Sequence, residues 1–192
     1  MQFNPLANTG IMLPEICLGS MTFGEQNNQA QAFEQLEYAL AQGLYFWDTA
    51  EMYPVPPKIE TQGATESILG NWIAKRGQRE QLFIASKIAG PSQGGSHIRA
   101  GQTRFTADEI STAIDGSLQR LQSDYIDLYQ LHWPQRATNF FGKLGYGNTE
   151  AQHEQEITAL EETLTALSDE IKKGRIRYIG RSEEHTSELQ SL

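Results

Sequence analysis

Three polar residues stand where three short apolar runs end. Asp48, Lys87 and His132 each lie at, or within two residues of, the end of a run with the composition of a buried parallel strand. Because the carboxyl ends of neighbouring parallel strands share one rim, we expect an acid, an amine and an imidazole at one mouth. Tyr53 follows five residues after Asp48 and can fold back over that mouth. Any one of the four could be an ordinary loop residue, but matched positions for all four favour a functional site.

Together these residue types can deliver a proton to a developing alkoxide. A tyrosine with the ordinary pKa of about 10 is a poor proton donor at neutral pH. An ammonium held against the phenol lowers that pKa, and an aspartate keeps the lysine charged and in place. A neutral histidine can orient a carbonyl oxygen toward the phenol. Since none of the four residues can supply a hydride, the set implies carbonyl reduction with a nicotinamide cofactor.

Alternating strands and helices are expected to position these residues. The strands are predicted at 44–47, 82–85, 126–131 and 176–179. The helices are predicted at 29–42 and 65–75, from a capping box at Thr106 and Glu109 through Leu121, and at 156–173. This strict alternation implies right-handed parallel crossovers in an α/β fold of about four βα units. Residues 2–3 and 11–13 flank a turn at 8–10, which predicts a small hairpin ahead of these units.

Four sequence segments carry a family resemblance. Residues 18–24, 48–53, 86–87 and 131–134 read LGSMTFG, DTAEMY, SK and LHWP. In this combination and order they resemble the aldo-keto reductases, and most of all the branch that includes the potassium-channel β subunits. The resemblance implies a (β/α)8 TIM barrel, and this chain corresponds to its N-terminal half. It also implies NADPH as hydride donor and small-molecule aldehydes or ketones as substrates.

The resemblance assigns a role to each of the four polar residues. Tyr53 is the general acid, Lys87 and Asp48 tune it, and His132 orients the carbonyl. The channel-associated branch tends to carry asparagine at the position of His132. This residue therefore favours an enzyme over the alternative, a non-catalytic NADPH-sensing regulatory subunit of the same fold.

The resemblance also implies which residues contact the cofactor. Thr22, Phe23 and Asp48 are the expected cofactor-binding residues, and Thr22 and Phe23 are expected to line the nicotinamide pocket. Arg99 and Arg104, in the loop after the second predicted strand, are expected to be solvated charges.

Composition limits the other functions. The chain has 192 residues, one cysteine and a net charge of −9. This acidic balance argues against a nucleic-acid partner, and the single cysteine fits a reducing compartment without disulfides. We found no secretory signal and no apolar stretch long enough to cross a bilayer, so we expect a cytoplasmic protein away from membranes.

Two further patterns carry little weight. No metal site is expected, because the remaining histidines lack ligand spacing; they are His97, His153 and His185. The glycines at 142, 145 and 147 do not lie between a strand and a helix, so a Rossmann phosphate loop is rejected.

The family pattern stops after Gly180. We expect residues 1–180 to be a partial aldo-keto reductase domain and 181–192 to be a non-native or disordered tail. The tail resembles a translated sequencing adapter, and the alternative is a genuine short polar tail. A half barrel exposes two sheet edges, and the family's second half makes most contacts to the cofactor pyrophosphate, ribose and adenine. We therefore expect little or no reductase activity and possible self-association; a functionless truncated product is the remaining alternative.

Overall fold

The computed structural model describes residues 1–91, 97–135 and 158–182. Its strands are β1 (Phe3–Pro5), β2 (Met12–Pro14), β3 (Leu18–Gly19), β4 (Phe46–Asp48), β5 (Phe83–Ile88), β6 (Ile126–Leu131) and β7 (Ile176–Arg181). Its helices are α1 (Gln29–Ala41), α2 (Ala64–Arg76), α3 (Ala107–Leu121) and α5 (Leu160–Lys172), with short 3-10 helices η1 (Arg79–Gln81) and η2 (Ile98–Gly101). No helix in these ranges is long and apolar enough to cross a membrane.

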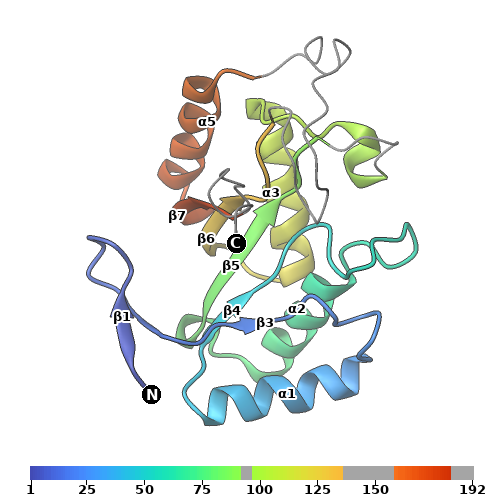
Figure 1. Ribbon diagram of the computed structural model, residues 1–192, viewed down its shortest axis with the longest axis vertical. Helices are drawn as coiled ribbons and strands as arrows, with labels where there is room; N and C mark the ends of the chain where they lie inside the picture. Colours follow the sequence, from blue (N-terminus) through green and yellow to red (C-terminus); the bar gives the residue numbers. More distant parts are fainter. Residues whose placement is uncertain (92–96, 136–157, 183–192) are drawn as a thin grey trace, which may run out of the picture.

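A parallel sheet forms the centre of the molecule. Its strands lie in chain order, β3-β4-β5-β6-β7, and β1 and β2 form a separate antiparallel hairpin. Neighbouring helices contact each other in the same order, α1 with α2, α2 with α3, and α3 with α5 (Figure 1). The expected α/β class, the parallel crossovers and the N-terminal hairpin are therefore confirmed.

One strand of this sheet was missed from the sequence. The sheet begins with β3, whose two residues pair in parallel with Trp47 and Asp48 of β4. Two residues are too few to show a strand period, so the sequence does not predict this strand. The four βα units are consequently β3-α1, β4-α2, β5-α3 and β6-α5, and β7 is a fifth strand.

The core lies between the sheet and its helices. All six residues of β5, the central strand of the sheet, are buried. Trp47 of β4 packs edge-on against Trp72 of α2, with ring centroids 5.0 Å apart. Each large apolar side chain buried in this way contributes about 1.5–3 kcal/mol to stability.

Local signals explain where the helices begin. Asn28 and Gln31 form a reciprocal capping box at the start of α1. The hydroxyl of Thr106 accepts the Glu109 backbone N–H at the start of α3, as expected. The carboxylate of Glu109, however, lies 3.5 Å from Arg104, so the box was predicted correctly only on its threonine side.

Several expectations fall outside the described residues. They concern the first residues of the helix expected from 156, the glycines at 142, 145 and 147, His153, His185 and the tail from 183 onward. Within the described part, residues 158 and 159 precede α5, which begins at Leu160.

Candidate active site

Lys87 is the centre of the site. Its ammonium donates to Asp48 Oδ2 at 2.5 Å, to the Thr49 carbonyl oxygen at 2.9 Å and to the Tyr53 hydroxyl at 3.2 Å. The same nitrogen lies 4.7 Å from the centroid of the Tyr53 ring. Hydrogen bonds with a charged partner are roughly twice as strong as neutral ones, so these contacts fix the amine beside the phenol.

Strand register brings these residues together. Asp48 at the end of β4 pairs with Ala85 of β5, two residues before Lys87. The end of β6 pairs with the end of β5 through Leu131 and Ile88. The His132 N–H then donates to the Ile88 carbonyl at 3.0 Å, which carries the ladder one residue further. Three adjacent strand ends thus place their polar residues on one rim.

The chain after β4 folds back over this rim. The Tyr53 N–H donates to the Ala50 carbonyl at 3.1 Å and closes a turn. The Gly63 N–H donates to the Tyr53 carbonyl at 2.9 Å, and the Gln62 amide donates to the Glu51 carbonyl at 2.7 Å. These bonds return the tyrosine to the strand ends from which the chain has just departed.

His132 completes the group. Its ring meets the Tyr53 ring edge-on at 79°, with centroids 5.6 Å apart, and also lies 4.9 Å from the Trp133 ring. Burial, and secondarily the charge of Lys87, lowers the pKa of His132 from 6.5 to about 3. The imidazole is therefore neutral at physiological pH, and it keeps one ring N–H that can donate to a carbonyl oxygen.

Burial differs across the four residues. The side chains of Lys87, Tyr53 and His132 are buried, whereas that of Asp48 keeps 28% of its surface exposed. The proton donor and its neighbours are thus held in a dry environment, where electrostatic contacts are strong. The aspartate carboxylate marks the side of the group that faces solvent.

The sequence profile of the Aldo/keto reductase family matches residues 15–192. The chain belongs to this family. The family resemblance seen in the four motifs is therefore confirmed, while the channel-associated branch stays a prediction. Membership identifies the chain with a family of oxidoreductases.

The curated relatives extend well beyond this chain. Protein tas of Escherichia coli K12 is 51% identical over 185 residues, which are 96% of this chain and 52% of the relative. The uncharacterized oxidoreductase YrpG of Bacillus subtilis is 32% identical over 187 residues, which are 95% of this chain and 49% of the relative. The chain thus spans about half the length of the curated relatives that it matches.

Solved aldo-keto reductase structures confirm the half-barrel fold. Tm1743, a thermostable aldo-keto reductase crystallised with the inhibitor epalrestat, matches with a TM-score of 0.70 at 30% identity. The holo form of AKR11C1 from Bacillus halodurans matches with a TM-score of 0.71 at 25% identity. All of this chain is covered in both cases, against 57% and 53% of the two structures.

The two residues expected to line the nicotinamide pocket lie in different surroundings. Thr22 is partly exposed, and its hydroxyl donates to Asn27 Oδ1 at 2.7 Å. Phe23 is only 1% exposed, and its side chain belongs to the apolar core beneath the sheet. Its carbonyl accepts the Thr65 hydroxyl at 2.7 Å. Of the two, only Thr22 has side-chain surface that a cofactor can contact in this arrangement, and the pocket itself stays a prediction.

Sequence reasoning missed a buried ion pair beside the site. Arg99 was expected to be solvated, but its side chain is 10% exposed and lies 3.0 Å from the Glu51 carboxylate. That expectation was wrong, because the buried acid that pairs with Arg99 lies 48 residues away in the sequence and leaves no local signal. Arg104, in contrast, is 41% exposed. Glu51 lies inside the DTAEMY motif, so its position between Asp48 and Tyr53 was the available signal.

A second buried acid braces the strand that carries the lysine. Glu66 at the start of α2 accepts the Ser86 hydroxyl at 2.5 Å and the Arg120 guanidinium at 2.7 Å. This pair ties β5 to α2 and α3, one residue before Lys87 in the chain.

Proposed function

We propose that this chain carries the proton-delivering half of an NADPH-dependent carbonyl reductase, with small aldehydes or ketones as substrates. One observation carries the proposal. A single buried ammonium, on Lys87, contacts both an aspartate and a phenol hydroxyl, and a neutral histidine ring lies against that phenol.

The proposed proton transfer uses each residue for one task. The Tyr53 hydroxyl and the neutral His132 ring donate hydrogen bonds to the substrate oxygen and orient it. Tyr53 then gives its proton to that oxygen as negative charge develops there. The Lys87 ammonium, 3.2 Å from the hydroxyl, stabilises the phenolate that remains. Asp48 keeps the ammonium in position through its 2.5 Å contact.

The residues present fit a nicotinamide cofactor. The site offers a proton and two hydrogen-bond donors but no group that can supply electrons, so a hydride must come from elsewhere. NADPH supplies that hydride when bound. In the proposal, Thr22 and Asp48 contact its nicotinamide end, because both side chains are partly exposed. Phe23 contributes from the buried side, as part of the core that supports the loop.

The activity of the 192 residues alone is expected to be low. The chain spans about half the length of its curated relatives. The family resemblance implies that most contacts to the cofactor phosphates and adenine lie in the remaining part. A chain that has the four polar residues of the site but binds NADPH weakly is expected to reduce carbonyl substrates slowly. Tight cofactor binding by a monodisperse monomer of these 192 residues would contradict this expectation.

A fusion tests the proposal. The chain is joined after Gly180 to the C-terminal remainder of protein tas, its 51% identical relative. Consumption of NADPH is followed with simple aldehydes and ketones for the chain alone and for the fusion. We expect turnover by the fusion and little by the chain alone. A fusion that binds NADPH but reduces no carbonyl would favour the regulatory-subunit alternative instead.

A further inference from the structure

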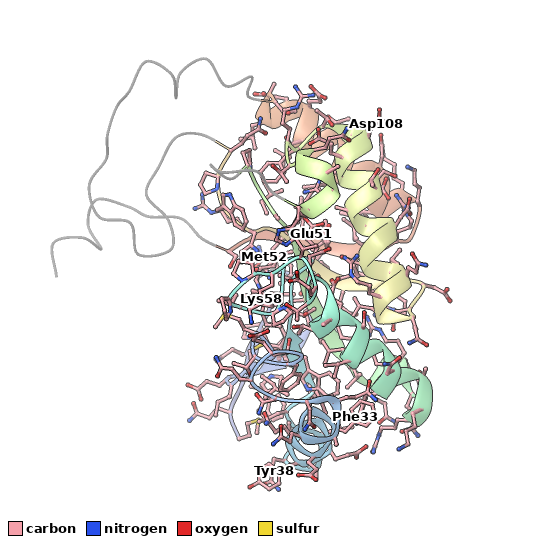
Figure 2. All side chains as sticks on the ribbon, turned by 90° about the vertical axis from the view of Figure 1, so that its right-hand side faces the viewer. Phe33, Tyr38, Glu51, Met52, Lys58 and Asp108 are labelled. Carbon is pink, nitrogen blue, oxygen red and sulfur yellow. The ribbon has the colours of Figure 1, made fainter. Side chains whose placement is uncertain are left out.

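Glu51 is a buried acid that the proton transfer does not use. It is 2% exposed and lies in the interior, beside Met52 (Figure 2). Its Oε1 accepts the Ala89 N–H at 2.5 Å and the Arg99 guanidinium at 3.0 Å. Burial raises the pKa of this carboxyl above its ordinary value, and Arg99 opposes that shift. A charged group this deep is retained only where its partners hold it firmly.

Arg99 connects three segments around the site. One nitrogen of its guanidinium donates to Glu51 and, at 2.9 Å, to the Ala89 carbonyl just after β5. Another donates to the Glu109 carbonyl in the first turn of α3 at 3.3 Å. The chain after β4, the end of β5 and the start of α3 therefore meet at one side chain.

The backbone that carries this arginine is strained. Arg99 and Ala100 have φ values of 46° and 52°, in the left-handed region that residues other than glycine avoid. Such strain persists only where surrounding contacts impose it, and it clusters at functional sites. The neighbouring Ile98 is buried in the same apolar cluster as Tyr53 and Trp133. The strained turn therefore contributes Ile98 to the apolar cluster that contains the tyrosine, and it bonds the tyrosine's loop through Arg99.

The path from this pair to the reacting hydroxyl is short. Glu51 lies two residues before Tyr53, and its N–H donates to the Lys87 carbonyl at 3.2 Å. Its carboxylate bonds the chain two residues after Lys87, at Ala89. Glu51 thus bonds the backbone at Lys87 itself and again just past the end of β5. A shift of this residue would move the tyrosine relative to the lysine.

We propose that Glu51 and Arg99 form a positioning pair, which holds the chain after β4 against the end of β5 and so sets the Tyr53 hydroxyl at the Lys87 ammonium. The pair touches no reacting atom. The inference rests on the proposed function only in naming Tyr53 as the proton donor. The competing view is that the pair stabilises the fold and leaves the site geometry unaffected.

Nuclear magnetic resonance of His132 tests this on the chain itself, without cofactor. The Tyr53 ring stands edge-on to His132 at 5.6 Å, so its ring current displaces the imidazole resonance. The His132 signal is assigned by its loss in His132→Asn, and Tyr53→Ala gives its position without the ring. We expect Glu51→Gln and Arg99→Gln to shift the His132 resonance more than halfway from its wild-type position to its position in Tyr53→Ala. Arg104→Gln, a change at the exposed arginine of the same loop, should leave it in place.

A conservative variant separates positioning from general stability. Lysine at position 99 keeps the charge but offers a single nitrogen, which cannot replace the second guanidinium nitrogen at the Glu109 carbonyl, so Arg99→Lys should recover only part of the wild-type signal. Amide hydrogen exchange in β6 is measured alongside. Protection there should persist while the His132 signal moves. The proposal is overturned if the signal stays at its wild-type position, or if it moves only in step with lost β6 protection. If both glutamine variants fail to fold, an unshifted signal in Arg99→Lys overturns it.

Kinetics in the fusion give a second readout. We expect Arg99→Lys to lower kcat about 10- to 100-fold with little change in KM, because misplacing a reacting group by about 1 Å costs that much. Equal effects on kcat and NADPH affinity would contradict a positioning role. A fusion without activity would challenge the proposed function but leave the resonance test intact.

Discussion

At the residue scale, the site depends on how a few buried charges are neutralised. The Lys87 ammonium has three oxygen partners within 3.2 Å, and Glu51 and Glu66 each have an arginine. Buried charges are costly unless they are paired and hydrogen-bonded, so each of these contacts stabilises a group that the interior would otherwise reject. The result is a rigid polar cluster around a single phenol.

His132 leads to a prediction about pH. Its pKa is about 3 in the folded chain, against 6.5 for an ordinary histidine. We therefore expect its imidazole resonance to show no titration between pH 5 and pH 8. A midpoint inside that range would contradict the neutral role assigned to this residue.

The same shift links His132 to acid stability. Because the folded pKa lies below the unfolded one, the contribution to stability is full above pH 6.5 and is lost as the pH falls toward 3. One pKa unit corresponds to about 1.4 kcal/mol, so the loss amounts to several kcal/mol. The free energy of unfolding, measured with denaturant, should fall less between neutral and acid pH in His132→Asn than in the wild type.

At the element scale, helix packing is tightest where α2 meets α3. A Cβ placed on Gly70 would lie 2.1 Å from the Arg120 carbonyl oxygen, which is backbone and cannot move aside alone. We expect Gly70→Ala to destabilise the chain by about 1–3 kcal/mol, as overpacking does. Thermal unfolding measures this directly.

A matched control lies in the partner helix. A Cβ on Gly116 of α3 meets only the end of the Arg120 side chain, at 3.0 Å. Gly116→Ala should therefore be neutral or stabilising by up to about 1 kcal/mol through helix propensity. Similar losses from both substitutions would show that close backbone approach is not the cause.

Elements long enough to show a repeating apolar pattern were predictable from the sequence. Short elements and strained turns were not. The Thr106 cap and the apolar stripe of α3 placed that helix correctly, and β6 matched its predicted residues. The strand β3 was missed because two residues carry no periodicity. Arg99 was misjudged because its burial depends on two φ values in the left-handed region and on an acid far away in the sequence. The predicted strand ends were enough to place the four polar residues together. They did not reveal the buried ion pairs that support those residues.

At the scale of the whole molecule, β3 and β7 are the edge strands of the sheet within the part of the chain that the structure describes. Ile179 on β7 is an exposed apolar residue, and so are Leu164 and Ile171 on α5, the helix that contacts β7. An open edge with apolar neighbours is a template for pairing with another chain. We therefore expect the 192 residues to self-associate through β7.

Sedimentation across a range of concentrations tests this association. We expect the weight-average mass to rise with concentration, and Ile179→Lys to suppress the rise, because a charge on an edge strand opposes pairing. Tyr38→Lys, at an exposed residue of α1 far from this edge, is the control and should behave as the wild type. A monomer at all concentrations would contradict the expectation.

The central claim is that the Tyr53 hydroxyl, set beside the Lys87 ammonium, delivers the proton. The most direct test is kcat for carbonyl reduction by the fusion carrying Tyr53→Phe, compared with Tyr38→Phe at an exposed tyrosine of α1. We predict that Tyr53→Phe lowers kcat by about 10²- to 10⁴-fold, the usual contribution of a general acid, with NADPH affinity retained. Tyr38→Phe should keep the wild-type rate. Wild-type turnover by the Tyr53→Phe fusion would contradict this account of the site.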